Sequence, residues 1–338
     1  MNGVPFAEAR TSATGESMGR TSFRQSKRAD NHVAFANYSS VVVLGDSYSD
    51  DNHRGREPLS NLYAPLGDPP VVWTSFLQAM MAQNRIVGFF NYAYNGAFAN
   101  KRLTNSSSSP IPDTRQQMQQ FFNELSSGAI NLGIRRTLVV WWIGVNPLDS
   151  FWITSCQSDN QTGVASSTDP RFIKVLNQVD KQVEEIWRQI AEVRAAINKT
   201  DTDYMIMNIP YLDEAPMQQN LAQKWSSNNS TLSNIYLELL DILIDRYNKG
   251  LQAIVDHATK LQNSIDNTST VKLYDAAKFW DKVLSHRLEY GIFNTNGTCY
   301  KDKTVCQEPE KYFFWDDLHM SPHVQRILAH DVLNFISS

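Results

Sequence analysis

The chain has 338 residues, of which 42% are hydrophobic and 11% aromatic, so it is long and apolar enough for a large core. Its 31 basic and 35 acidic residues give a net charge of −4. A chain with this charge balance has no overall electrostatic attraction to nucleic acid or to an anionic membrane. No stretch has the roughly 18 to 20 consecutive apolar residues of a membrane span, so we expect no stable membrane association.

The N-terminal residues differ in character from the rest of the chain. Residues 1–35 are small, polar and weakly basic, and they lack the apolar segment of a secretory signal. We interpret them as a disordered leader or a remnant of an expression vector. No linker interrupts the remaining sequence, which predicts a single domain over residues 36–338.

Eight Asn-x-Ser/Thr triplets favour passage through the secretory pathway. They begin at Asn37, Asn105, Asn160, Asn198, Asn228, Asn229, Asn267 and Asn296. Of the three cysteines, Cys299 and Cys306 bracket a short polar loop that a disulfide would pin, and Cys156 is left over. We therefore expect a secreted glycoprotein with this disulfide. The alternative is three buried thiols in a cytosolic protein.

The chain alternates short β-rich runs with helical ones. The apolar run 41–44 predicts a buried parallel strand. In chain order the next expected elements are a helix at 73–83, a strand at 86–94, a helix at about 113–126 and a strand at 137–143.

The second half continues the alternation. The expected elements are an amphipathic helix at 171–197, a strand at 204–207, an irregular polar segment at 211–230, a helix at about 231–263, a strand at 271–274 and a C-terminal helix after Pro322. Five strands separated by helices predict an α/β fold, a three-layer α/β/α sandwich around a five-stranded, mainly parallel sheet. Ligands of such sheets bind at the carboxyl ends of the strands.

Ser47 lies at the first of these strand ends. It follows residues 41–44 directly, in a tight Gly45-Asp46-Ser47 turn that would expose its hydroxyl at the edge of the sheet. Such a serine is a candidate nucleophile. A Gly-Asp-Ser tripeptide alone is common in ordinary turns, so the assignment depends on partners elsewhere in the chain.

Two further residues mark the ends of the second and third expected strands. At Gly96 a backbone N–H can approach a ligand because no side chain intervenes, and the side-chain amide of Asn146 can point across the same edge. With the N–H of Ser47 they would form an oxyanion hole with three donors. Ordinary turn chemistry explains either residue taken alone.

The base and its orienting acid are expected shortly before the last helix. In Asp316-Asp317-Leu318-His319 the carboxylate of Asp316 is three residues from His319 and can reach its Nδ1. Asp317 is the less favoured alternative. This arrangement would leave Nε2 of His319 to act as general base toward Ser47.

Other residues near these segments have weaker assignments. Tyr48 and Trp315 adjoin the nucleophile and the acid and are possible substrate contacts, although core packing is the default for such rings. His319 and His323 have a spacing found in metal-ligand pairs, but no third ligand cluster accompanies them. We predict no metal site and no cofactor, and His53 is interpreted as a solvated loop residue.

The segments GDSYSD, NGA, GVN and DDLH, in this order over residues 45–319, resemble the four blocks of the GDSL (SGNH) hydrolase family. The resemblance implies the SGNH-hydrolase, flavodoxin-like fold. It also implies functional roles for Ser47, Gly96, Asn146, Asp316 and His319 as nucleophile, two oxyanion donors, acid and base.

The match has two departures. Asn52 stands where the family often has Gly, a change that the backbone tolerates. Pro147 replaces the Asp that often follows the third-block Asn, which puts the detailed oxyanion geometry in doubt. Asp50 fits the family's Asp after the nucleophile and is interpreted as structural.

Within the family the chain looks most like the fungal secreted branch, which includes acetylesterases and enzymes that cleave lipid acyl esters. The polar character of 211–230 is a poor lipid-binding face. We therefore expect a monomeric serine hydrolase that forms an acyl-enzyme at Ser47 and acts on a small-molecule or carbohydrate ester, as a carbohydrate acetylesterase or short-chain esterase. The alternatives are a lipase or phospholipase-type acylhydrolase, an acyltransferase of specialised metabolism with the same triad, and a non-enzymatic sugar-binding protein on a relic fold.

Overall fold

A computed structural model describes residues 38–51, 71–83, 86–104, 108–157, 163–197, 201–264 and 269–338. Ala34–Ser338 forms one compact unit. The leader expected at 1–35 lies outside the described residues. So do Asn52, His53 and the triplets that begin at Asn37, Asn105, Asn160, Asn198 and Asn267.

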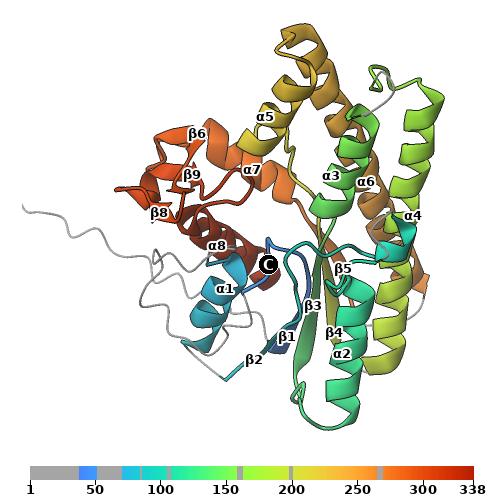
Figure 1. Ribbon diagram of the computed structural model, residues 1–338. Coiled ribbons are helices and arrows are strands. Elements are labelled where there is room, and N and C mark those ends of the chain that lie inside the picture. The colour runs from blue at the N-terminus through green and yellow to red at the C-terminus, as the bar shows by residue number, and fades with distance from the viewer. Residues whose placement is uncertain are drawn as a thin grey trace, which may run out of the picture. The chain divides into compact units, whose positions relative to one another are not determined.

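A five-stranded parallel sheet forms the centre of this unit (Figure 1). Its strands in spatial order are β2 (Gly88–Asn91), β1 (Tyr38–Gly45), β3 (Arg136–Trp142), β4 (Thr202–Met207) and β5 (Val271–Tyr274). This confirms the predicted five-stranded sheet.

Helices cover both faces of the sheet (Figure 1). On one face α1 (Trp73–Ala82) packs against α8 (Pro322–Ser337). On the other face lie α2 (Thr114–Ser126), α4 (Pro170–Ile197) and α6 (Ser230–Ser264). The predicted three-layer α/β/α arrangement is therefore confirmed.

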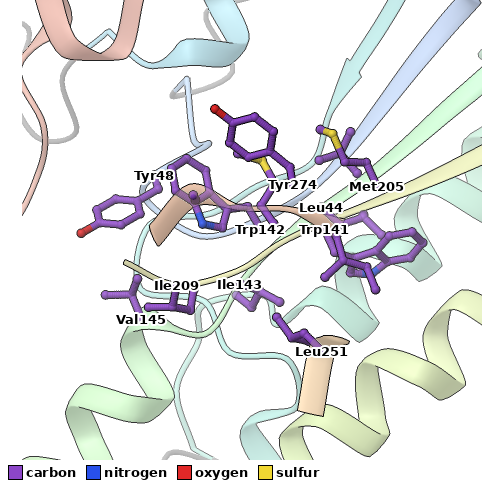
Figure 2. Packing of buried hydrophobic residues seen from close by; sticks show 14 of the residues in the cluster. Leu44, Tyr48, Trp141, Trp142, Ile143, Val145, Met205, Ile209, Leu251 and Tyr274 are labelled. Carbon is purple, nitrogen blue, oxygen red and sulfur yellow. The ribbon is translucent and has the colours of Figure 1, made fainter. Parts of the chain in front are cut away.

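The central strands β1, β3 and β4 begin with polar residues and continue as unbroken apolar runs, because both of their faces are covered there. Successive side chains of a strand point to opposite faces, and the two tryptophans of β3 show this alternation. The ring of Trp142 lies 6.2 Å from that of Trp73 on α1, whereas Trp141 donates from Nε1 to Gln189 on α4 at 3.3 Å. Figure 2 shows both rings within the packed core.

Three helices were not predicted. The segment 211–230, expected to be irregular, contains α5 (Pro216–Trp225). Helices α3 (Val145–Cys156) and α7 (Ala276–Ser285) follow β3 and β5 directly. The buried residues Ala276, Phe279, Trp280 and Val283 of α7 recur at helical spacing, so this helix has an apolar stripe that the prediction missed.

Strand β2 is shorter than predicted, because regular pairing with β1 stops at Asn91. The chain nevertheless stays beside β1 for three more residues. Tyr92 N donates to Val43 O at 2.9 Å, and Tyr94 N donates to Gly45 O at 3.2 Å. The chain thus runs beside β1 over most of the predicted range 86–94, but only Gly88–Asn91 pairs with β1 as a regular strand.

The region between α7 and α8 contains short strands in two small sheets, which were not predicted. Strand β6 (Asn294–Thr298) pairs with β9 (Tyr312–Phe314), and β7 (Tyr300–Lys301) pairs with β8 (Thr304–Val305). Two single 3₁₀ turns, η2 (Lys101–Leu103) and η3 (Pro309–Lys311), complete the elements. Among the described residues, no helix is both long and apolar enough to cross a membrane.

Candidate active site

Ser47 lies in a tight turn two residues beyond the end of β1. The N–H groups of Ser49 and Asp50 both donate to the carbonyl of Asp46, at 3.0 and 2.9 Å. Gly45 is required where the turn starts, because a Cβ there would lie 2.5 Å from the carbonyl oxygen of Trp142. Ser47 is 2% exposed, so the turn does not expose its hydroxyl as expected, and the side chain is buried in the described structure.

The carboxyl group of Asp46 connects this turn to the start of α3. It accepts the N–H of Tyr48 at 3.1 Å and lies close to the N–H groups of Gly144 and Val145. Burial raises the pKa of Asp46 to about 7, although these N–H groups and the charge of His319 act in the opposite direction. This link between the first and third motif segments was not predicted. The Asp of the Gly-Asp-Ser turn was the only signal for it.

Asp316 holds the imidazole of His319. Its Oδ2 lies 2.8 Å from Nδ1, and its Oδ1 accepts the N–H groups of Leu318 and His319 at 2.9 and 2.7 Å. Burial raises the pKa of Asp316, but the hydrogen bonds and charge of His319 outweigh it and bring the pKa below its ordinary value. Asp316, rather than Asp317, is thus the carboxylate on Nδ1.

The nucleophile turn and the Asp316–His319 loop are in contact. The ring of Tyr48, the residue after Ser47, meets the imidazole of His319 edge-on at 5.7 Å between centroids. The Tyr48 hydroxyl donates to the carbonyl of Leu318 at 3.3 Å. Two segments about 270 residues apart therefore meet beyond the carboxyl end of β1.

Gly96 lies in the loop after β2, not at a strand end as predicted. Its φ of +78° is in the left-handed region, where glycine has no steric cost. A Cβ there would also lie 2.8 Å from Cδ1 of Ile111. Both constraints explain why glycine occupies this position.

Asn146 lies in the first turn of α3. We predicted it at the end of β3, so that placement is wrong. Its Nδ2 donates to the carbonyl of Ala97 at 3.0 Å, which joins it to the loop that contains Gly96. Pro147 is the third residue of α3, where an N–H has no partner within a helix. The proline therefore costs no helical hydrogen bond.

The rings of Tyr48 and Trp315 are buried. Tyr48 is 0% and Trp315 1% exposed. Tyr48 packs against Trp142 at 5.1 Å, and Trp315 stacks on Tyr300 at 5.3 Å with an angle of 5° between the planes. These contacts give both rings a packing role, and their contact with substrate stays a prediction.

A disulfide-closed hairpin supports the loop from outside the sheet. Cys299 and Cys306 form the disulfide, whereas Cys156 is buried with a free thiol. Cys299 N donates to Phe314 O at 3.2 Å, and Tyr300 N donates to Trp315 O at 2.6 Å. The hairpin is thus hydrogen-bonded to the residues that immediately precede Asp316.

Helix α5 lies beside the same loop, which the sequence did not indicate. Met217 N donates to Asp317 O at 2.8 Å, and Gln218 Nε2 donates to Oδ1 of Asp149 at 3.1 Å. Burial raises the pKa of Asp149 to about 6, with a contribution from Asp317 and an opposing one from Gln218. Several carboxyl groups therefore surround the loop besides Asp316.

Within the described ranges, no group of three or more His, Cys, Asp or Glu side chains is arranged to hold a metal ion. His323 instead hydrogen-bonds through Nε2 to the carbonyl of Tyr290 at 2.8 Å.

A cavity of about 490 Å³ lies between α5, α7 and β6. It is lined by Glu214, Gln219, Asp281, Leu284, Ser285, Arg287, Thr295 and Asn296.

Residues 41–332 match the family model of the GDSL-like Lipase/Acylhydrolase. The chain therefore belongs to this family and is an ester hydrolase. No curated protein sequence matches the chain.

Several solved structures align with most of the chain at low identity. A member of the lipolytic protein G-D-S-L family from Veillonella parvula is 12% identical, with a TM-score of 0.38 over 87% of this chain and 96% of its own. A protein from Arabidopsis thaliana is 10% identical, with a TM-score of 0.40 over 88% and 98%. A carbohydrate esterase is 10% identical, with a TM-score of 0.36 over 88% and 64%.

Proposed function

We propose that the chain hydrolyses carboxylic esters through an acyl-enzyme on Ser47, with His319 as general base and Asp316 as the acid that orients it. One observation carries this proposal. The carboxylate of Asp316 lies 2.8 Å from Nδ1 of His319, on a loop whose carbonyl at Leu318 accepts the hydroxyl of Tyr48, the neighbour of Ser47.

The chemistry follows from this arrangement. Asp316 fixes the tautomer with the proton on Nδ1, so Nε2 can take the proton of Ser47 as Oγ attacks the ester carbonyl. His319 then gives this proton to the departing alcohol. Water attacks the acyl-enzyme in the same way, and the acid is released.

The oxyanion formed in each step needs preorganised donors. We assign this role to the N–H groups of Ser47 and Gly96 and to the side-chain amide of Asn146. The bond from Asn146 to Ala97 supports the assignment, because it brings the amide and the Gly96 loop together. An amide has two N–H donors, and Ala97 takes one of them.

The substrate we propose is a short-chain ester, with a carbohydrate acetate as the natural form, as in the fungal secreted branch that the sequence resembles. The surface of α5 supports this choice over a lipid ester. Its exposed side chains Gln219, Asn220, Gln223 and Lys224 are polar, and α5 lies beside the Asp316–His319 loop. An interfacial lipase would need an apolar face there.

We also propose that the protein is a secreted glycoprotein. The disulfide between Cys299 and Cys306 supports this, because such bonds persist in oxidising compartments. The acceptor side chains of Asn228, Asn229 and Asn296 are exposed, as glycosylation requires.

A fluorophosphonate probe followed by mass mapping tests the nucleophile. We expect a single adduct on Ser47, absent in Ser47→Ala and strongly reduced in His319→Ala. Ser49→Ala is the matched control, because Ser49 lies in the same turn and accepts a hydrogen bond from Trp73 at 3.2 Å. An adduct on another residue, or one that survives Ser47→Ala, would refute the assignment.

The substrate class is tested with p-nitrophenyl esters of increasing chain length and with acetylated oligosaccharides. We expect the highest kcat/KM for the acetate. A clear preference for long acyl chains would instead indicate a lipase or phospholipase-type acylhydrolase. Transfer of the acyl group to added alcohols in preference to water would indicate an acyltransferase.

A further inference from the structure

Gly45 is the last residue of β1 and lies two positions before Ser47. Its backbone groups face the edge of the sheet where the pairing with β2 has already stopped. The carbonyl still receives the N–H of Tyr94 at 3.2 Å. A buried N–H at this edge also needs a partner, because a buried donor without one destabilises the fold.

The side chain of Gln117 on α2 provides this partner. Its Oε1 accepts the N–H of Gly45 at 2.9 Å, and its Nε2 donates to the carbonyl of Gly45 at 2.8 Å. The same Nε2 also donates to Pro112 O at 3.2 Å. Gln117 is 0% exposed. Its primary amide thus replaces a neighbouring strand at the point where β1 leads into the turn.

We propose that Gln117 is a positioning residue for Ser47: it fixes the backbone of Gly45 and thereby the direction in which the nucleophile turn leaves the sheet. This inference rests on the proposed role of Ser47. The hydroxyl must come within hydrogen-bond reach of its base for the reaction, and a displacement of about 1 Å can lower the rate by about 100-fold. Gln117 contacts no reacting atom and acts only through Gly45.

The chain contains a matched control for this interaction. Gln182 on α4 is also 0% exposed and makes the same two-point contact, with the N–H and the carbonyl of Asn100, both at 3.2 Å. Asn100 precedes the 3₁₀ turn η2 and lies outside the nucleophile turn. Replacing Gln117 by methionine removes three hydrogen bonds and replacing Gln182 removes two, both at similar volume, but only the first replacement reaches Ser47.

The experiment compares Gln117→Met and Gln182→Met with the wild type on p-nitrophenyl acetate. We expect Gln117→Met to lower kcat by about 10- to 100-fold with KM changed less than about threefold, since substrate binding does not use this amide. Gln182→Met should lower the melting temperature by a similar amount and keep kcat within about threefold. Equal kcat values in the two variants would overturn the proposal.

A second variant covers the case in which Gln117→Met fails to fold. In Gln117→Glu a protonated carboxyl can still accept from Gly45 N and donate to Gly45 O, whereas a carboxylate cannot donate. Burial raises the pKa of such a group, so this variant should approach wild-type kcat at mildly acidic pH and lose it as pH rises. A kcat profile with the shape of the wild-type one would contradict the proposal. If the wild type itself hydrolyses no ester, the proposed function fails instead.

Discussion

The nucleophile turn at Ser47 and the Asp316–His319 loop meet at one site, but they are supported in different ways. The turn continues directly from β1, and its backbone is bonded to β3 through Asp46 N and Trp142 O at 3.3 Å. The loop lies outside the five-stranded sheet, between β9 and α8. Its support comes from the small sheets and the disulfide hairpin of residues 294–314.

The positions of the catalytic side chains therefore depend on two different kinds of contact. The geometry between Asp316 and His319 is local, because the two residues lie three positions apart in one loop. The geometry between the loop and Ser47 depends on packing, of which the contact of Tyr48 with His319 is one part. Changes to the sheet side and to the hairpin side should therefore have separable effects.

The largest effect is expected for Asp316→Asn. The backbone N–H groups on Oδ1 keep the amide oxygen at that position, so Nδ2 faces Nδ1 of His319 and favours the tautomer with the proton on Nε2. We expect kcat to fall by about 10³- to 10⁴-fold while the fold is retained. Steady-state kinetics with p-nitrophenyl acetate, together with circular dichroism, measures this. Asp317→Asn is the neighbouring control and should keep kcat within about threefold. A similar loss in both variants would mean that the charge of the loop matters and not its bond to His319.

On the sheet side, Asp46→Asn tests the cost of a buried carboxyl group. The pKa of Asp46 lies at about 7, above its ordinary value of 3.8. The folded state thus binds the proton more tightly than the unfolded state, and the wild type loses stability as pH rises from about 4 to about 7. A pKa shift of this size lowers the free energy of unfolding by about 4 kcal/mol, and the wild type does not regain this stability above pH 7.

Urea unfolding at several pH values measures this effect. Asn has no proton to lose, so the variant should gain stability relative to the wild type as pH rises, and the two should converge near pH 4. The Asn oxygen can still accept the N–H of Tyr48, which preserves the turn. A difference between variant and wild type that does not change with pH would refute the shifted pKa.

In both regions the sequence predicts the features that are local. The strands appear as short runs such as Val41–Leu44 because both faces of the sheet are covered, and that pattern needs no tertiary information. The pair Asp316 and His319 follows from its local spacing in the same way.

The positions of Asn146 and Gln117 depend on tertiary contacts that the sequence pattern does not reveal. Asn146 was placed at a strand end because Gly144 and Pro147 looked like a turn, whereas they begin α3. Gly144 has a φ of +143° and a Cβ there would lie 2.6 Å from the ring of Tyr247, a neighbour about a hundred residues away in the chain. Gln117 had no signal at all, since only the fold brings α2 to Gly45.

The hairpin side is tested by replacing both Cys299 and Cys306 with alanine. The bridge closes a loop with a sequence separation of 7, and the chain-entropy model assigns a loop of this size about 2–3 kcal/mol. We expect this loss in urea unfolding. We also expect about a tenfold lower kcat, because Phe314 and Trp315 lose ordered backbone partners.

Cys156→Ala is the control for the loss of a cysteine that is in no disulfide. Dithiothreitol should reproduce the effect in the wild type and in Cys156→Ala, but not in the double variant. If the double variant lost stability and kept full kcat, the hairpin would stabilise the fold without ordering the loop.

The smallest effect is expected at Tyr300, whose ring stacks on Trp315 at 5.3 Å. An aromatic pair of this kind contributes about 0.5–1.5 kcal/mol beyond its buried area. Tyr300→Leu should therefore lower stability by about 1 kcal/mol and kcat by about threefold, whereas Tyr300→Phe keeps the ring and should match the wild type. Trp315 directly precedes Asp316. The ratio of kcat between Tyr300→Phe and Tyr300→Leu therefore measures how much the side-chain contact between the hairpin and the loop contributes to catalysis. If Tyr300→Leu left kcat unchanged while the double cysteine variant lowered it, the backbone bonds from Cys299 and Tyr300 would account for that effect.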